Sequence, residues 1–345
     1  MTLAIKPPFM PMEARTQATI PEGDGWQYEP KWDGFRCLAF REGDTVQLQS
    51  KSGQPLERYF PELVEACLAL RATKFVLDGE IITPVNGALS FDALLQRIHP
   101  ADSRVRKLSV ETPAQLVVFD LLVDESGKSL VDLPIPERRP RLESFASKYL
   151  AGNPVIRLSP ATRDLRTVQK WFKAVGSGLD GIIAKRIDMP YMSGDRTGMV
   201  KVKHHRTADC VVGGFRYAEK ARVIGSMLLR LYDDEGLLNH VGFTSAFTDE
   251  QRVELTPKLE KLVSPPGFTG KAPGGPSRWS TKRSTEWEPL APKLVIEVEY
   301  DHFTSGRFRH GTKMLRWRPD KAPKQCTMDQ VGPEMKSPLG LLDAK

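Results

Sequence analysis

The sequence has few cysteines and no long apolar segment, and both features exclude whole classes of protein. The cysteines lie far apart and form no CxxC pair: Cys37, Cys67, Cys210 and Cys326. Zinc ribbons and disulfide frameworks need closely spaced cysteines, so neither is expected, and a reducing cytoplasm fits. No apolar run reaches the roughly 18 residues of a membrane span, and the N-terminus lacks the apolar core of a secretion signal. We therefore expect a cytoplasmic protein with no membrane partner.

Internal repeats and low-complexity tracts are also missing, which leaves an ordinary globular composition. The 345 residues are 40% hydrophobic and 27% charged, and this length suits two domains better than one. The net charge of +7 favours a polyanionic partner without proving one.

The pattern of expected secondary structure changes after Lys203, where we place a domain boundary. Residues 1–203 mix strand patterns with helical ones, which indicates an α+β domain of antiparallel sheets with flanking helices. Residues 204–325 show short strands and one clear helix, Asp249–Leu262, with Thr248 as its N-cap. This pattern suits a small β-barrel of OB type. Ser264–Trp279 is expected to be a flexible loop, and residues 326–345 a mobile tail, because both are rich in Pro and Gly.

Lys31 is the first candidate for chemistry, in the stretch Lys31-Trp-Asp-Gly-Phe-Arg36. A lysine nucleophile must lose its proton, and burial or nearby cations such as Arg36 would lower its pKa from about 10.4. Gly34 would let backbone approach a ligand closely. The alternative is a solvated lysine in a turn, since motifs of four residues recur by chance.

Carboxylates next to a glycine occur at two further strand ends, in Asp78-Gly79-Glu80 and Asp180-Gly181. Such groups bind ribose hydroxyls or hold Mg²⁺, although a turn with solvated acids explains either pair alone. Phe119 lies in the apolar run Leu116–Val123, which we interpret as a buried strand. Its ring either packs in the hydrophobic core or forms a surface on which a nucleotide base stacks.

Two groups of cations point to phosphate. Lys201 and Lys203 alternate with valines, so both lysines face one side of a strand, where an anion would relieve their repulsion. The segment Arg307–Lys324 is rich in Arg and Lys with aromatic residues between them, which suits a nucleic-acid backbone. A basic, solvated edge strand is the alternative for both.

Taken in order, these stretches resemble the motifs of the covalent nucleotidyltransferases, and most closely those of the ATP-dependent DNA ligases. Lys31–Arg36 is similar to the KxDGxR element, whose lysine carries AMP, and Ser50–Gly53 to the SRxG element, with Lys51 in place of arginine. Asp78–Glu80 resembles the ribose-binding DGE, and Asp180 stands where the family normally has glutamate near the metal. The closing RxDK element is similar to Arg316–Lys321. The size and the absence of accessory domains are most like the minimal bacterial ligase C type.

The resemblance implies a nucleotidyltransferase domain (1–203) followed by an OB-fold domain (204–325). It implies ATP as cofactor with Mg²⁺ or Mn²⁺, and a monomer acting on nicked duplex DNA at the nucleoid beside other DNA-repair proteins. The implied catalytic residues are Lys31, Asp33, Arg36, Lys201, Lys203, Arg316, Asp320 and Lys321. The implied nucleotide-binding residues are Glu29, Lys31, Arg36, Lys51, Glu80, Phe119, Arg196, Lys201 and Lys203, and the implied metal ligands are Glu80 and Asp180.

Two alternatives remain at this stage. An RNA ligase or an mRNA guanylyltransferase shares the KxDG element. A non-catalytic OB-type nucleic-acid-binding protein would need no nucleophile, and the presence of Lys31, Glu80, Lys201 and Lys203 argues against it.

Overall fold

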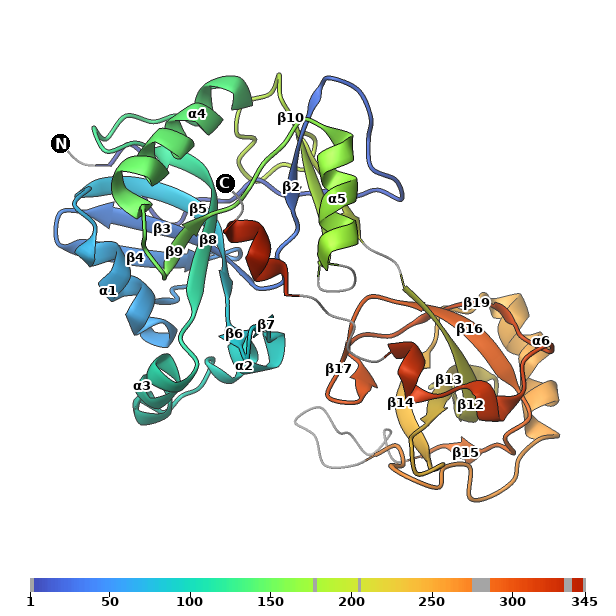
Figure 1. Ribbon diagram of the computed structural model, residues 1–345. Helices are drawn as coiled ribbons and strands as arrows, with labels where there is room; N and C mark the ends of the chain where they lie inside the picture. The colour runs from blue at the N-terminus through green and yellow to red at the C-terminus, as the bar shows by residue number, and fades with distance from the viewer. Residues whose placement is uncertain (1–2, 176–178, 204–205, 275–285, 332–336, 344–345) are drawn as a thin grey trace. The chain divides into compact units, whose positions relative to one another are not determined.

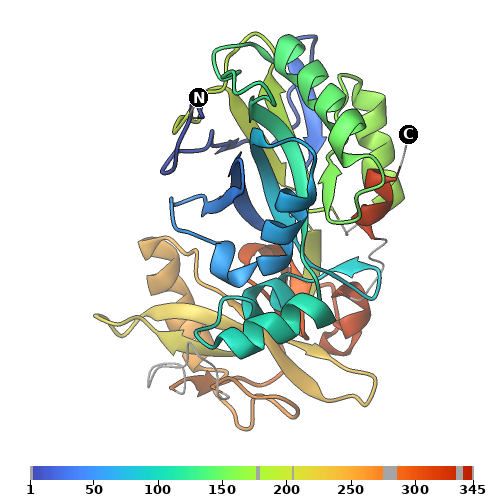
Figure 2. The same ribbon diagram turned by 90° about the vertical axis from the view of Figure 1, so that its left-hand side faces the viewer.

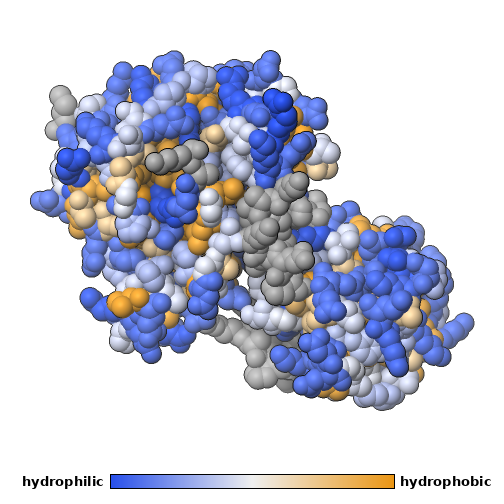
Figure 3. Space-filling model, viewed as in Figure 1, coloured by the Kyte–Doolittle hydropathy of each residue, from blue (hydrophilic) through white to orange (hydrophobic). Residues whose placement is uncertain are grey.

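The computed structural model describes residues 3–175, 179–203, 206–274, 286–331 and 337–343, and the chain forms two compact units (Figure 1). Unit 1 comprises Met1–His204 together with Glu334–Lys345, and unit 2 comprises His205–Pro333. None of the helices in the described ranges is long and apolar enough to cross a membrane. The face drawn in Figure 3 is largely hydrophilic, with apolar residues in small groups.

Unit 1 contains a five-stranded sheet that is antiparallel except for its last pair. Its order is β4 (Thr45–Ser50), β3 (Phe35–Glu42), β5 (Lys74–Ile82), β8 (Gln115–Val123) and β9 (Ile156–Leu158). The apolar residues of β3 alternate as a strand requires. Cys37 and Ala39 join a core with the helices on one face, whereas Leu38 and Phe40 join a core on the other face.

Helices cover the first of these faces. They are α1 (Pro61–Ala69), α2 (Phe91–Gln96) and α4 (Ile135–Phe145), followed by a π-helical turn at Ala146–Leu150. The sequence analysis did not anticipate α3 (Asp102–Glu111), which buries only Val105 and therefore shows almost no apolar stripe. A short 3₁₀ turn (Glu57–Tyr59) precedes α1, and a hairpin of β6 (Pro84–Val85) and β7 (Ala88–Leu89) follows β5.

A four-stranded sheet packs against the other face. Its order is β1 (Arg15–Thr16), β11 (Met199–Lys203), β10 (Gly181–Arg186) and β2 (Trp26–Pro30), with α5 (Leu165–Val175) beside it. Val200 and Val202 of β11 are buried whereas Lys201 and Lys203 are not, so the predicted alternation is confirmed. Apolar residues of both sheets fill part of the space between them, and the remaining space is the cavity described below.

Unit 2 is built on an antiparallel sheet, as predicted for an OB fold. The order is β14 (Leu238–Thr244), β13 (Ile224–Tyr232), β12 (Arg206–Tyr217), β16 (Val295–Tyr300) and β19 (Lys313–Trp317), with β15 (Glu288–Pro289) also on β12. A hairpin joins β17 (Phe303–Thr304) to β18 (Arg307–Phe308). The two edge strands of this sheet, β14 and β19, come together at one point. There the backbone N–H of Thr312, the residue before β19, donates a hydrogen bond to Phe243 O of β14 at 2.9 Å. Helix α6 (Asp249–Glu260) has Thr248 as its N-cap, as predicted. Part of the loop predicted at Ser264–Trp279 lies outside the described residues.

The C-terminal segment differs from the expected mobile tail, and this corrects the sequence analysis. Cys326 is fully buried in the core of unit 2, between 3₁₀ turns at Pro323–Gln325 and Met328–Val331. The 3₁₀ turn η5 (Pro338–Leu342) packs on unit 1, where Leu341 joins the core around Trp32 and Asp343 forms an ion pair with Arg157 (Figures 1 and 2, red). Local composition suggested disorder, but the leucines near the end of the chain have an apolar site to fill.

Candidate active site

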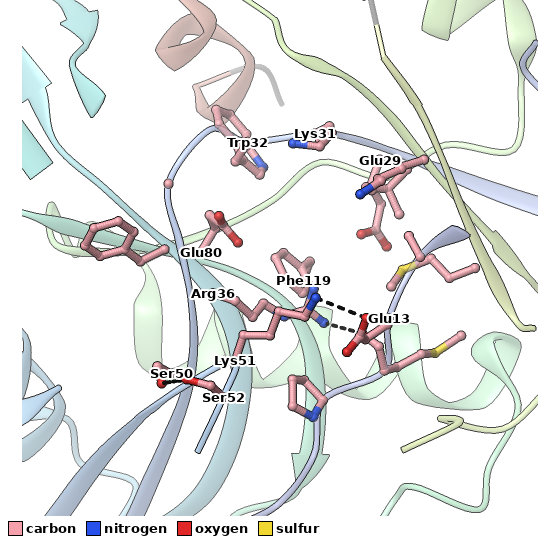
Figure 4. Close-up of a pocket in the computed structure, with 18 of the residues that line it drawn as sticks. Glu13, Glu29, Lys31, Trp32, Arg36, Ser50, Lys51, Ser52, Glu80 and Phe119 are labelled. Atoms are coloured by element: carbon pink, nitrogen blue, oxygen red, sulfur yellow. Dashed lines mark hydrogen bonds and ion pairs between the residues drawn. The ribbon is translucent and has the colours of Figure 1, made fainter. Parts of the chain in front are cut away.

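A cavity of about 790 Å³ lies between the two sheets of unit 1, and we call it the intersheet cavity (Figure 4). Its size is typical of a site for a small molecule. The five-stranded sheet contributes Phe35, Arg36, Glu80 and Phe119, and the four-stranded sheet contributes Glu29, Lys31, Ile183, Lys185, Met199 and Lys201. The N-terminal segment Met10–Ala14 and the turn Ser50–Ser52 complete the wall.

Lys31 lies where the chain leaves β2 and crosses from one sheet to the other. Its backbone N–H donates to Gly181 O at 2.9 Å, which holds it beside the start of β10. Three residues later the chain passes so close to β5 that a Cβ on Gly34 would lie 2.0 Å from Ile81 O. A glycine is therefore required at this position for steric reasons. The motif glycine thus has a steric role, since it allows the close approach of the chain to β5.

The Lys31 ammonium donates a hydrogen bond to Asp180 and forms an ion pair with it. Burial alone would lower the pKa of Lys31, but Asp180, with Glu80 and Asp33 nearby, raises it above its ordinary value. The sequence analysis expected a lowered pKa, and this expectation is wrong for the structure without a ligand. The missing signal was Asp180, which is distant in the sequence and paired with Lys31 only by the fold.

Lys201 faces the cavity from β11, next to the ion pair. Burial, together with the charges of Lys31, Lys203 and Lys51, lowers the pKa of Lys201. Lys203 lies opposite Gly181 in the β10–β11 register, one residue from Asp180. Several cations therefore converge on one end of the cavity, which suits a group with more than one negative charge.

Phe119 enters the cavity because β8 is irregular at this position. Asp78 pairs with Asp120 and Gly79 with Val118, so Phe119 is the extra residue of a β-bulge. Bulges redirect a side chain, and this one places the ring against two cations. The Arg36 guanidinium lies 4.6 Å and the Lys185 ammonium 4.9 Å from the ring centroid. The ring is thus partly exposed to the cavity with its position fixed by charged neighbours.

Arg36 is held by a carboxylate that the sequence analysis quoted without assigning a role. Its Nε and Nη2 atoms each donate to Asp78 at 2.6 Å, and although burial lowers the pKa of Arg36, Asp78 raises it overall. The Tyr191 hydroxyl donates to Asp78 at 2.5 Å and accepts from Met12 N at 3.0 Å. Nothing in the sequence around Tyr191 indicates this contact, because it joins residues 113 positions apart.

Glu29, Lys51 and Arg196 also have partners that the sequence did not reveal. Glu29 lies 2.9 Å from the Lys185 ammonium and is buried with it. Lys51 and Arg196 both contact Glu13, at 3.0 and 2.8 Å. Asp120 is buried beside these groups; burial raises its pKa, but Arg138 and Lys185 lower it overall. These predicted nucleotide-binding residues therefore belong to two clusters of ion pairs, one around Lys185 and one around Glu13.

Glu80 is the acidic residue in the cavity wall whose charge is least compensated by its surroundings. Burial raises the pKa of Glu80 to about 7, against the opposing effects of Arg36 and Lys31. Glu80 and Asp180 both offer carboxylate oxygens, the atoms that Mg²⁺ prefers. Asp180 already attracts a cation and Glu80 lacks sufficient positive charge, so each carboxylate suits a cationic partner.

Two of the three predicted residues of unit 2, Asp320 and Lys321, belong to a cluster around Asp209 and Arg318, and the sequence analysis did not identify Asp209. Arg318 lies 2.8 Å from Asp209 and 2.8 Å from Asp320, and Lys321 lies 2.7 Å from Asp209. The hydrogen bonds from Arg318 lower the pKa of Asp320 to about 2. Arg316 pairs separately with Glu297 at 2.6 Å. The RxDK element is therefore preorganised within its own unit.

Comparison with known protein families identifies the family to which this chain belongs. Residues 11–203 match the family model described as the ATP dependent DNA ligase domain, and residues 220–321 match the ATP dependent DNA ligase C terminal region. The chain belongs to the ATP-dependent DNA ligase family. The resemblance inferred from the motifs is confirmed, and the non-catalytic and RNA-directed alternatives are set aside.

Relatives agree with this assignment, and solved structures share the fold. DNA ligase C1 of Mycolicibacterium smegmatis is 44% identical over 342 residues, and DNA ligase C of Mycobacterium tuberculosis is 41% identical over 350 residues. Each alignment covers 96% of both chains, in keeping with the ligase C type. A structure from a structure-function analysis of Lig E DNA ligases, 16% identical, has a TM-score of 0.53 and covers 90% of this chain and 99% of its own. The structure titled Pmar-Lig_PreS3, 17% identical, has a TM-score of 0.57 over 85% of this chain and 64% of its own. These structures show the shared fold.

Proposed function

We propose that this ligase seals nicks between 3′-hydroxyl and 5′-phosphate ends in duplex DNA through AMP bound covalently to Lys31. The observation that carries the proposal is the composition of the intersheet cavity. The lining of this cavity brings together a lysine, an aromatic ring, a carboxylate and a further cation: Lys31, Phe119, Glu80 and Lys201. These are the groups needed for a nucleophile, a base shelf, a ribose or metal contact and a phosphate contact.

In the first step, the unprotonated Nζ of Lys31 attacks the α-phosphorus of ATP. A phosphorus–nitrogen bond forms, the bond to the β-phosphate oxygen breaks, and pyrophosphate leaves with the electron pair. Asp180 accepts the hydrogen bond of the lysine, so it lies on the route by which the proton departs. Lys201 stabilises the charge that accumulates on the α-phosphate, and Phe119 fixes the adenine.

Glu80 and Asp180 are the residues that would hold a divalent metal. Mg²⁺ or Mn²⁺ bound there would neutralise phosphate charge and weaken the hold of Asp180 on the Lys31 proton. The chain itself supplies the remaining orientation, since Lys185 contacts both Glu29, two residues before Lys31, and the ring of Phe119 on the other sheet.

The second and third steps transfer AMP to the 5′-phosphate of the nick and then release it when the 3′-hydroxyl attacks. Lys203 serves all three steps because a phosphate lies beside Lys31 throughout. Arg316, Asp320 and Lys321 serve the first step by orienting pyrophosphate, which leaves only then. The substrate is nicked duplex DNA at the nucleoid, with other repair proteins as partners of a monomeric enzyme.

Labelling with α-³²P-ATP and Mg²⁺, followed by denaturation, tests the proposal. We expect label on the wild type and on Lys128→Ala, which alters an exposed lysine in a turn, and none on Lys31→Ala. The labelled wild type, freed of ATP, should then seal a nicked duplex. Label retained on Lys31→Ala, or labelling by GTP alone, would refute the assignment.

A further inference from the structure

Two of the cations assigned to nucleotide or phosphate binding share one carboxylate oxygen. Lys51 Nζ lies 3.0 Å and Arg196 Nη2 lies 2.8 Å from Glu13 Oε2, and Arg196 Nε donates to the same oxygen at 2.9 Å. Lys51 follows β4 and Arg196 precedes β11, so Glu13 connects the two sheets at the rim of the intersheet cavity. Figure 4 shows Glu13 and Lys51 next to each other in the lower part of the picture, with Lys31 at the top.

Glu13 is the fixed member of this group. Its side chain is 15% exposed, whereas the side chains of Lys51 and Arg196 are 58% and 66% exposed. Its backbone N–H donates to Asp195 O at 2.9 Å, and the chain then enters β1, which pairs with β11. The two cations therefore extend from solvent toward a carboxylate that the backbone holds in place.

The three charges occupy the position that a bound phosphate would need. A phosphate within hydrogen-bonding distance of both cations would lie against Glu13 Oε2, where like charges repel. Without Glu13, Lys51 would add its charge to that of Lys201, whose pKa already responds to it. The Glu13 carboxylate relieves the repulsion between Lys51 and Arg196, but it would itself repel a phosphate that binds to these two cations.

We propose that Glu13 is an internal counter-anion that competes with a substrate phosphate for Lys51 and Arg196. This makes Glu13 a positioning and specificity-determining residue: it holds both cations at the rim and releases them only to a group of higher negative charge. The inference rests on the proposed function for the identity of the ligand, a phosphate of ATP or of the nicked DNA. The two sources share the same chemistry and are separated by the experiment.

Glu13→Gln keeps the shape and removes the charge. Because exposed ion pairs contribute little each, we expect roughly a two- to tenfold lower KM for the phosphate-bearing substrate at low salt, with kcat retained. The difference should shrink at high salt, where exposed charges are screened. Glu13→Asp keeps the charge and should restore a KM near that of the wild type. Asp44→Asn, in the exposed β3–β4 turn at the far end of these strands, makes the same change in net charge and controls for it.

Two assays identify the phosphate. Self-adenylylation gives KM for ATP, and sealing of a pre-adenylylated nick without ATP gives KM for DNA. A lower KM in the first assay assigns the phosphate to ATP, and a lower KM in the second assigns it to the nick. An unchanged or higher KM in both assays, or an equal change in Asp44→Asn, would overturn the inference. Calorimetric binding of ATP without divalent metal provides a readout that needs no turnover. A wild type that binds ATP but is never labelled would contradict the proposed function rather than the role of Glu13.

Discussion

The raised pKa of Glu80 predicts that this residue destabilises the ligand-free protein at neutral and alkaline pH. An unfolded chain releases the Glu80 proton near the ordinary pKa of 4.5, whereas the folded protein retains it until about pH 7. Between these values the unfolded state is progressively favoured, and the full cost is present above pH 7. Since one pKa unit corresponds to about 1.4 kcal/mol, the cost is about 3 kcal/mol.

Glu80→Gln should therefore stabilise unit 1 while abolishing adenylylation. Glutamine has nearly the same shape and no charge, so it avoids the cost. At pH 8 the variant should unfold about 6–12 °C above the wild type, if one kcal/mol shifts a unit of this size by about 2–4 °C. At pH 5, where the folded protein keeps this proton and the unfolded chain has released it only in part, most of this difference should disappear. Differential scanning calorimetry at both pH values measures the difference.

The control is Glu65→Gln, which changes an exposed glutamate on α1 and should show no pH-dependent gain. A divalent metal should stabilise the wild type at pH 8 and stabilise Glu80→Gln much less, because binding to the folded state alone favours it. A gain of the same size at pH 5 and pH 8, or a loss at pH 8, would show that Glu80 is not a partly buried carboxylate short of positive charge.

Three further outcomes follow from the contacts. Gly34→Ala would place a methyl group 2.0 Å from a carbonyl oxygen, so adenylylation and the unfolding temperature should both fall; normal values for both would contradict the close approach. Tyr191→Phe removes the hydroxyl that bonds Asp78 and should cost about 1–3 kcal/mol in the unfolding free energy, as urea titration would show. Given a pre-adenylylated nick without ATP, Asp320→Ala should still seal it, whereas Lys203→Ala should seal it poorly, with a loss of a few kcal/mol in transition-state stabilisation. Equal failure of both variants would disprove the division between steps.

The sequence predicted those parts of the site that depend on local pattern. The alternation around Lys201 and Lys203, the helix cap at Thr248 and the strand that carries Phe119 are all readable from neighbours a few residues away. A strand of period two or a capping box leaves a repeated signature in a short window. The order of the short sequence motifs, from Lys31–Arg36 to Arg316–Lys321, was then enough to indicate the family.

Contacts between distant segments could not be predicted in this way. The pair of Lys31 with Asp180 reverses the expected direction of the lysine pKa, and 149 positions separate the two residues. Arg196 and Glu13 are 183 positions apart. A charged side chain carries no sign of its partner, so the sequence shows which charges are present but not which of them neutralise each other.

The return of the last residues to unit 1 has consequences for synthesis and for dissection of the enzyme. Unit 2 is in effect an insertion within unit 1, because both of its ends connect to it. Leu341 belongs to the same apolar core as Trp32, the neighbour of Lys31, so this core is completed only after residues 337–343 have been synthesised. A fragment that stops at residue 204 would leave this apolar site exposed to water. A peptide spanning residues 337–343, added to such a fragment, would supply the missing part from a separate molecule.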